Sequence, residues 1–307
     1  MAQITAAMVK SLRDQTSAGM MDCKKALNET DGDLEAAADW LRTKGIAKAD
    51  KKAGRIAAEG LVAVALAPKT GAVVEVNSET DFVARNDAFQ GAVSEIADLA
   101  VTVDSTEELA AAKTASGENV KDHLTTLVGK IGENMSLRRM ARLTVSEGAV
   151  AGYIHNAVTE GMGKIGVLVA LESAGDVAKL EDLGKKIAMH IAATNPLALT
   201  VDDLDQDLVA KEREMLKAEA LESGKPESIV DKMVEGRMVK FFKESVLMTQ
   251  IFVMDGERSI EQVLADEAKA LGTDIKMTGY VRMGVGDGIE KKEEDFAAEV
   301  AAAVKGG

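Results

Sequence analysis

The strongest constraint on the fold of this chain is an internal duplication. Glu59–Ala63 (EGLVA) reappears as Glu147–Ala151 (EGAVA), and Gly71–Val76 (GAVVEV) reappears as Gly166–Leu171 (GVLVAL). In each block the apolar pattern predicts a strand, a turn and a second strand, followed by a helix. The spacing between the blocks grows by seven residues from the first segment to the second, which places an insertion in the connection between strands, where insertions are tolerated. The sequence therefore predicts an α+β core made of two related halves.

The helix after the second strand is marked by apolar residues at helical spacing. They are Phe89, Val93, Ile96 and Ala100 in the first block, and Leu180, Leu183, Ile187 and Ile191 in the second. Asp87 and Gln90 form a candidate capping box at the start of the first helix.

The two blocks differ between the second strand and the helix. The first has Thr80-Asp81-Phe82-Val83, whereas the second has roughly Ala174-Gly175-Asp176-Val177, without an aromatic residue. Two interpretations are open: the Phe82 ring is aimed at a partner, or it packs back on its own subdomain. Because the second block has no equivalent ring, the repeated unit does not require one, which favours a partner.

Residues 4–45 are predicted to form a compact three-helix unit. Its apolar positions recur at helical spacing as Ile4, Met8 and Leu12, then Met20, Cys23 and Leu27, then Leu34, Ala37, Ala38 and Leu41. Asp33 is a candidate cap of the third helix, which is predicted to end at Gly45. Met21 falls off the face that contains Met20, so either one of the two methionines is exposed or both fill the core.

A basic segment follows the predicted third helix. Residues 42–55 (RTKGIAKADKKAGR) contrast with the acidic remainder of the chain. Such a charge run is most simply a solvated linker, and the alternative is a docking strip for an acidic partner surface.

After Pro196 the pattern changes to charged helices. Apolar residues at helical spacing lie on both sides of Gly224-Lys225-Pro226, which predicts an antiparallel helical hairpin. Two helices alone cannot bury their apolar faces, so the hairpin packs on the body or on a second copy of the chain. The rest is predicted as a strand at Ile251–Met254, a helix at Ile260–Leu271, a strand at Lys276–Val285 and a final helix that contains Phe296.

Composition and charge limit the class of partner. The chain of 307 residues carries 37 basic and 51 acidic side chains, a formal net charge of −14, which repels phosphate backbones and argues against nucleic acid as a partner. The single cysteine, Cys23, excludes an internal disulfide and fits a reducing compartment. No apolar run has the length of a membrane span, and the N-terminus has no signal-peptide pattern. We expect a cytoplasmic protein that binds another protein.

Motifs for catalysis are weak. Gly161–Gly166 (GMGKIG) has the spacing of a dinucleotide loop, but it precedes a strand instead of following one, so a hairpin turn is the better interpretation. His123, His155 and His190 lie on separate predicted elements, without metal-binding spacing. No cofactor, no metal site and no covalent catalysis are predicted.

Two segments carry a resemblance to a known family. Leu12–Leu27 (LRDQTSAGMMDCKKAL) and Glu75–Arg85 (EVNSETDFVAR) are similar to the two signature segments of bacterial elongation factor Ts, the nucleotide exchange factor for elongation factor Tu. Ile131–Asn134, Ile187–His190 and Met233–Met238 extend the similarity over essentially the whole chain.

The resemblance implies a particular domain organisation. It comprises a ubiquitin-associated-like three-helix domain with its basic linker (1–55), the first half of the core (56–146), the second half (147–196 and 241–286), an inserted coiled-coil-like helical hairpin that contacts a partner or dimerises (197–240) and a C-terminal helical module (287–307).

The resemblance also implies a mechanism. The Thr80–Val83 tip would enter the nucleotide domain of GDP-bound elongation factor Tu, where the Phe82 ring dislodges the bound Mg²⁺ and promotes GDP release so that GTP can bind. Further partner-binding positions implied by the resemblance are Leu12, Met20 and Met21 in the N-terminal domain and Ile131, Gly132 and His155 in the core. The alternative function is a non-catalytic, dimeric, protein-binding adaptor.

Overall fold

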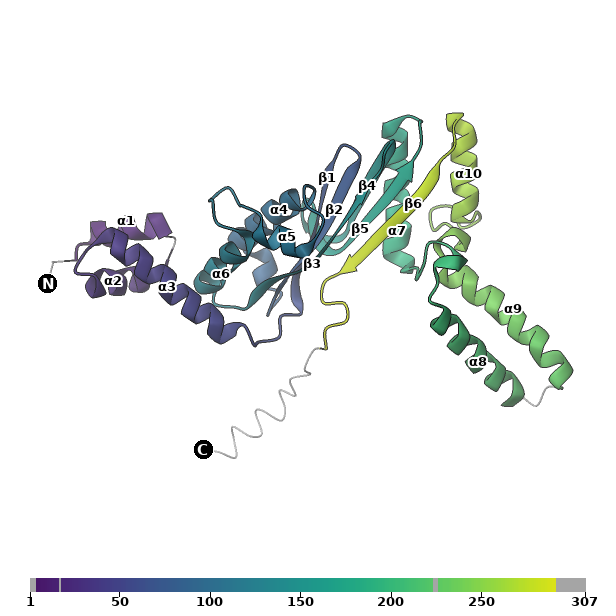
Figure 1. Cartoon of the computed structure of the whole chain (residues 1–307), viewed down its shortest axis with the longest axis horizontal. Helices are drawn as coiled ribbons and strands as arrows, with labels where there is room; N and C mark the ends of the chain where they lie inside the picture. Colours follow the sequence, from purple (N-terminus) through teal and green to yellow (C-terminus); the bar gives the residue numbers. More distant parts are fainter. Residues whose placement is uncertain (1–3, 17, 223–225, 291–307) are drawn as a thin grey trace.

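The computed structural model describes residues 4–16, 18–222 and 226–290 (Figure 1). Within these ranges the chain is an elongated α+β molecule, with three helices at one end, a six-stranded antiparallel sheet in the middle and a helical hairpin at the other end. The predicted α+β class is confirmed. None of the helices in these ranges is long and apolar enough to cross a membrane.

The N-terminal unit consists of α1 (Ala6–Thr16), α2 (Met20–Glu29) and α3 (Leu34–Lys52). Its small core is made of buried side chains from all three helices, namely Leu12, Cys23, Ala26, Leu27 and Ala37. The Asp33 side chain accepts hydrogen bonds from the backbone N–H groups of Glu35 at 2.9 Å and Ala36 at 3.0 Å, which confirms the predicted cap of α3.

The prediction that α3 ends at Gly45 is wrong, because the helix continues to Lys52. Residues 46–52 (IAKADKK) are mostly Ala and Lys, which favour helices, and a single glycine does not stop a helix that such residues extend. The extension packs on α6 (Val120–Ile131), where a Cβ on Gly129 would lie only 3.0 Å from the Gly45 Cα. The predicted linker is therefore mostly helix.

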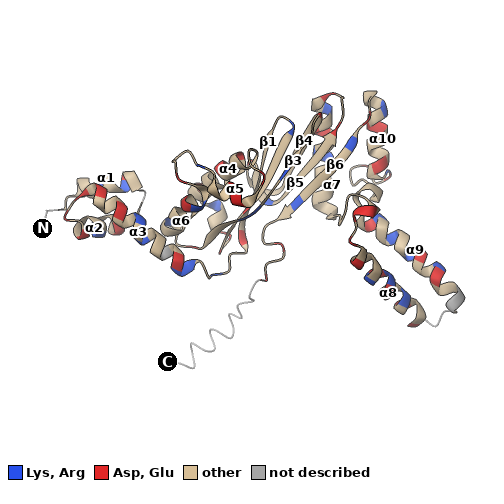
Figure 2. Cartoon of the chain, in the orientation of Figure 1, with Lys and Arg blue, Asp and Glu red and all other residues tan. Residues whose placement is uncertain are grey.

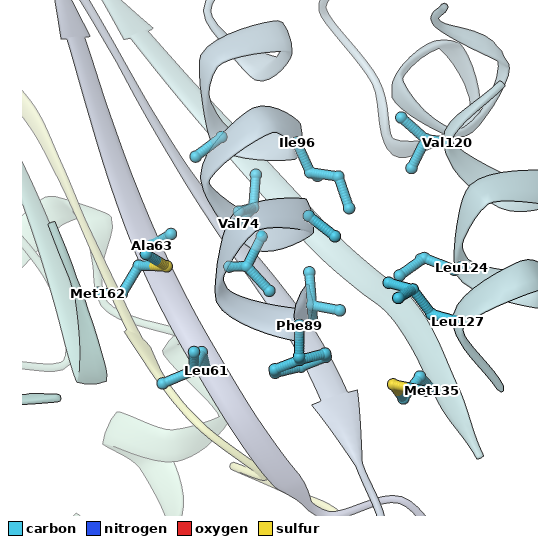
Figure 3. Close-up of a cluster of buried hydrophobic side chains, with 14 of the residues drawn as sticks. Leu61, Ala63, Val74, Phe89, Ile96, Val120, Leu124, Leu127, Met135 and Met162 are labelled. Atoms are coloured by element: carbon cyan, nitrogen blue, oxygen red, sulfur yellow. The ribbon is translucent and has the colours of Figure 1, made fainter. Parts of the chain in front are cut away.

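The first half of the core contains β1 (Glu59–Ala67), β2 (Thr70–Ser78), α4 (Asp87–Ala100), α5 (Thr106–Ala111), α6 and β3 (Met135–Thr144). β1 and β2 form a hairpin, and β3 pairs with the other edge of β2. Figure 3 shows α4 and α6 covering one face of these strands, with Phe89 and Ile96 of α4 facing Leu124 and Leu127 of α6. The predicted apolar face of α4 is confirmed.

The predicted capping box of α4 is wrong. Asn86 caps the helix, because its side-chain oxygen accepts hydrogen bonds from the N–H groups of Ala88 at 3.0 Å and Phe89 at 3.2 Å. The Gln90 amide instead donates to the Ala84 carbonyl at 2.9 Å. It thereby fastens the turn that precedes the helix.

The second half repeats this arrangement with β4 (Gly148–Thr159), β5 (Met162–Glu172), α7 (Val177–Thr194), α10 (Ile260–Leu271) and β6 (Lys276–Gly284). β4 and β5 form a hairpin, and β6 pairs with the other edge of β5. Gly161 lies in the hairpin turn at φ +72°, which confirms the predicted turn, but the rest of the glycine-rich motif belongs to β5. α7 and α10 contribute to a second apolar core with Ile187, Ile191 and Val263.

The two halves have the same unusual backbone features at equivalent positions of the duplicated sequence. Gly60 and Gly148 adopt φ values of +124° and +115°, and a Cβ at either one would lie 2.2 Å from a carbonyl oxygen, that of Val76 or that of Leu171. Pairing with the third strand is irregular directly before Val76 in the first half and directly before Leu171 in the second. The two halves therefore share one backbone plan, as the duplication predicted.

The halves join into one sheet with the order β3-β2-β1-β5-β4, with β6 also on β5. A third apolar cluster lies between the halves and includes Val62, Val73, Val150, Leu168 and Met283. The contacts there are reciprocal. A Cβ at Gly71 would lie 2.7 Å from Val150 Cγ1, and a Cβ at its counterpart Gly166 would lie 2.5 Å from Val62 Cγ1.

The insertion in the second half contains the hairpin of α8 (Gln206–Glu222) and α9 (Glu227–Ser245). The helices pack through Leu216, Ala220, Val230, Val234 and Met238, and ion pairs such as Arg237 with Glu219 at 2.8 Å link their exposed sides. Figure 2 shows acidic and basic residues interspersed along both helices. The predicted helical hairpin is confirmed. Short 3-10 turns lie at Val83–Arg85, Val201–Asp203 and Leu247–Thr249.

The predicted strand at Ile251–Met254 is wrong. Ile251 forms only an isolated bridge with Ser259, and the chain turns at once, since the Gly256 N–H donates to the Phe252 carbonyl at 2.8 Å. Of this apolar run only Phe252 is buried, in the second core, whereas its neighbours are exposed. The helix and strand predicted after it are confirmed as α10 and β6, whereas the predicted final helix with Phe296 lies outside the described residues.

Candidate functional site

The connection between β2 and α4 presents Phe82 to solvent. Its side chain is 78% exposed, whereas the neighbouring Val83 and Ala84 are buried in the first core at 4% and 2%. Single exposed apolar side chains are common on protein surfaces, but aromatic residues are enriched among those that anchor protein–protein interfaces. The alternative interpretation, that the ring packs back on its own subdomain, does not fit this exposure.

The tip is held on the side that precedes Phe82. Thr80 donates to both oxygens of the Glu133 carboxylate, from its N–H at 2.9 Å and from Oγ1 at 2.7 Å. The Thr80 carbonyl accepts from Ser78 Oγ at 2.9 Å. With Val83 buried on the other side, Asp81 and Phe82 are left as the projecting residues.

The second half has a shorter connection at the equivalent place. It runs from Ser173 to Asp176, and Asp176 caps α7 by accepting from the Lys179 N–H at 3.0 Å. The connection from Glu79 to Asn86 in the first half is longer, so the tip is an addition to the shared plan.

Met20 and Met21 begin α2 and are 60% and 75% exposed. Both therefore lie on the surface. The interpretation that both methionines fill the core is wrong, and so is the placement of Met20 on the buried face of the helix. Leu12 is fully buried between the three helices and has no exposed atoms to offer a partner. This burial does not fit the direct contact that the resemblance implied for Leu12.

The remaining predicted positions lie in two places. Ile131 ends α6, and Gly132 caps it at φ +90°, one residue before the Glu133 that binds Thr80, so these two residues adjoin the tip. His155 is exposed on β4 in the other half, with its Nδ1 3.2 Å from the Tyr153 hydroxyl. The fold brings the 131–132 pair to the tip but leaves His155 in a separate region.

A buried ionic cluster lies on the strand that leads to the tip. The fully buried Glu75 accepts hydrogen bonds from Arg138 at 2.9 Å, Asn77 at 2.9 Å and the Gly286 N–H at 2.8 Å, and also from Arg139. Burial alone would raise the pKa of Glu75, but the hydrogen bonds from Gly286, Asn77 and the two arginines lower this pKa below its ordinary value.

Sequence reasoning missed Glu75, Glu79 and Glu133 as functional or supporting residues. The signal for Glu75 was a charge inside an apolar strand, and that for Glu133 was an acid directly after a helix-ending glycine. In the described part of the chain, no group of three or more His, Cys, Asp and Glu side chains is placed to hold a metal ion.

An exposed aromatic ring on a fixed turn, with exposed methionines on a separate helical unit, is typical of proteins that bind another protein. The family model described as elongation factor TS matches residues 79–287. The chain belongs to the elongation factor Ts family.

Full-length relatives agree with this assignment. The elongation factor Ts of Maricaulis maris is 59% identical over 308 residues, which covers 99% of both chains. Those of Parvibaculum lavamentivorans and Caulobacter vibrioides are each 56% identical, with coverage of 100% and 98% of both chains.

Proposed function

We propose that this protein is a cytoplasmic nucleotide exchange factor for elongation factor Tu. The Thr80–Val83 tip enters the nucleotide domain of the GDP-bound partner, the Phe82 ring inserts between side chains there, and the bound Mg²⁺ is dislodged. GDP then leaves and GTP binds, without covalent chemistry and without a cofactor on this chain. The observation that carries the proposal is the 78% exposure of Phe82 on a turn that is fixed on both sides, in a member of this family.

One ring cannot supply the whole effect. Burial of a Phe side chain contributes about 1.5–3 kcal/mol, and each 1.4 kcal/mol or so is a factor of about ten in affinity, so Phe82 alone weakens GDP binding by at most about a hundredfold. The remainder comes from loss of the Mg²⁺ and from docking contacts elsewhere. By linkage, GDP weakens binding of this protein by the same factor, which makes the factor recyclable.

The docking contacts are assigned to three surfaces. Met20 and Met21 on α2 grip the nucleotide domain, with the buried Leu12 supporting their helix instead of touching the partner. Ile131 and Gly132 extend the contact beside the tip. His155 and the base of the α8–α9 hairpin contact another domain of the partner.

The domain organisation belongs to the same proposal. It has a ubiquitin-associated-like domain at 1–55, core halves at 56–146 and at 147–196 with 241–286, a coiled-coil-like hairpin at 197–240 and a C-terminal module at 287–307. The reciprocal contacts between the halves and the separate core of α1–α3 support these divisions.

Replacement of Phe82 tests the tip. The Phe82→Ala variant is expected to fold normally, because the ring is mostly exposed, and to slow catalysed GDP release by about tenfold to a hundredfold, the range of one lost Phe burial. Stopped-flow fluorescence with labelled GDP on purified elongation factor Tu measures the rate. Val177→Ala, an exposed apolar residue at the equivalent turn of the second half, is the matched control.

A near-normal release rate with Phe82→Ala would rule out the tip mechanism. The rival function, a non-catalytic dimeric adaptor, is separated by stoichiometry. Substoichiometric amounts of an exchange factor accelerate GDP release from excess partner, whereas an adaptor binds without accelerating it.

A further inference from the structure

We infer that Glu133 is a positioning residue for the tip, which holds Thr80 so that Phe82 is presented to the partner in one conformation. The inference rests on the proposed exchange function and concerns the part of the chain that makes the tip effective. Glu133 itself touches neither the nucleotide nor the Mg²⁺ in this scheme.

The first argument is the geometry around Thr80. The N–H and the hydroxyl of this residue each donate to a different oxygen of Glu133, at 2.9 and 2.7 Å, and its carbonyl accepts from Ser78 Oγ. All the polar groups of Thr80 are thus satisfied within the protein. Bonds to an ionised carboxylate are about twice as strong as neutral ones. The residue two positions before Phe82 therefore has one fixed conformation.

The second argument is that a second hydrogen bond joins the same two segments in the opposite direction. The Asn134 N–H donates to the Glu79 carboxylate, while the Glu133 carboxylate accepts from Thr80. Residues 79–80 and residues 133–134 are thus joined by two hydrogen bonds. In each bond a carboxylate of one segment accepts from a backbone N–H of the other segment. Such a pair resists both sliding and rotation of the tip relative to residues 131–134.

The contacts between residues 79–80 and residues 132–134 form a junction beside the tip. The third argument is that the end of α3 and the residues just after it also contact this junction. Lys52 donates to the Gly132 carbonyl, Arg55 forms an ion pair with Glu79 at 3.3 Å, and the Asn134 amide donates to the Arg55 carbonyl at 2.8 Å. The unit that carries Met20 and Met21 and the tip that carries Phe82 are therefore fastened to the same short segment.

A fixed tip matters because an unfixed one must be ordered during binding. Immobilising loop residues at an interface costs free energy, and a loop that is already ordered avoids that cost. Glu133 is only partly buried and lies outside the apolar core, so its loss should affect the tip more than the overall stability. Loss of a residue that only stabilises the fold would instead lower the overall stability more than it changes the tip.

The test uses four variants of the full chain and a fifth as the control. Glu133→Gln keeps the shape but loses the charge and one acceptor, and it is expected to lower kcat/KM for GDP release by about tenfold or more, as expected for loss of charge-assisted bonds. Thr80→Val removes the hydroxyl donor, and Thr80→Ser should recover most of what Thr80→Val loses. The double variant Thr80→Val/Glu133→Gln should lose no more than Glu133→Gln alone, because both act through one contact. Glu181→Gln, an exposed acid on α7, is the control.

Amide hydrogen exchange on the free protein provides a readout that does not depend on the partner. The Thr80 amide should be protected in the wild type and exchange at least tenfold faster in Glu133→Gln, with the melting temperature nearly unchanged. If exchange is unaltered, or if it accelerates while kcat/KM stays normal, the positioning role is wrong. If Phe82→Ala is itself fully active, the tip mechanism fails, and the role of Glu133 in presenting Phe82 fails with it. If the wild-type chain does not accelerate GDP release at all, the proposed exchange function fails.

Discussion

Glu75 carries a charge in the middle of a buried strand. Its carboxylate joins β2 to Arg138 and Arg139 of β3 and to the Gly286 N–H in the turn after β6. The counterpart of Glu75 in the second half is Ala170, so the repeated fold does not require a charge there. A buried carboxylate is tolerated only when such partners satisfy it. One residue thus fastens the turn after β6 to the strand that leads to the tip.

The Glu75→Gln variant is expected to lose about 3 kcal/mol of unfolding free energy at pH 7, because it leaves two arginines without their buried counter-charge. The native pKa of Glu75 lies below its ordinary value of 4.5. The unfolded chain therefore binds the proton first as the pH falls, so the contribution is fully present above about pH 4.5 and is lost as the pH drops through the native pKa. Urea unfolding at a series of pH values measures both effects.

The control for this variant is Glu235→Gln, which breaks an exposed ion pair with Arg213 on the hairpin. Exposed pairs contribute about 1 kcal/mol or less. Equal stability of Glu75→Gln and the wild type at pH 7 would contradict the role assigned to the cluster.

At the scale of elements, the crossing of α3 and α6 sets how the N-terminal unit meets the core. The helices approach closely where Gly129 faces the Gly45 backbone, with 3.0 Å between an added Cβ and the Gly45 Cα. Any side chain at position 129 pushes the helices apart. Since Lys52 at the end of α3 and Arg55 just after it contact the junction beside the tip, the crossing also aligns these contacts.

Gly129→Val is expected to loosen this crossing at a cost of about 1–3 kcal/mol of overpacking. Cleavage by trypsin at Lys51–Arg55 should then become about fivefold faster or more, because the end of α3 opens more often. Gly45→Ala is the control, since a Cβ there meets no atom within 4 Å and alanine favours the helix. An unchanged cleavage rate for Gly129→Val would show that the crossing does not hold α3 in place.

The elements that the sequence predicted well were those with a local or repeated signal. The duplicated strands, α4, α7 and the hairpin follow from periodicity, and Phe82 stood out because the two halves could be compared. The extent of α3 was missed because Gly45 was treated as a stop although helix-forming residues follow it. The exposure of Met20 was missed because the apolar pattern of a short helix does not show whether a residue in its first turn faces the core or the solvent.

The junction beside the tip could not be predicted in the same way. Glu133 and Thr80 are far apart in sequence, and so are Asn134 and Arg55, and their contacts exist only once α3, α6 and β2 are packed. Sequence spacing carries no information on such contacts. For the same reason, the motif at Ile131–Asn134 could be noticed but Glu133 could not be given its role.

At the scale of the whole molecule, the hairpin extends away from the sheet with exposed apolar side chains. Met215 on α8 and Val239 on α9 are 50% and 53% exposed. We expect a concentration-dependent homodimer through this hairpin, and Met215→Glu with Val239→Glu should shift it to monomer. Sedimentation velocity over a wide concentration range measures the shift, with Val177→Glu as the control. A wild-type chain that stays monomeric throughout would contradict this expectation.

The reciprocal seating of Gly71 and Gly166 has a consequence for how function is distributed. Each half inserts the same kind of side chain into the same kind of gap in the other, which is the geometry of a two-fold symmetric subunit interface. Identical subunits must carry every feature twice, but halves joined in one polypeptide need not. One half could therefore hold the tip and the other the hairpin. The result is a polar molecule, in which one half carries the tip and the other carries the hairpin.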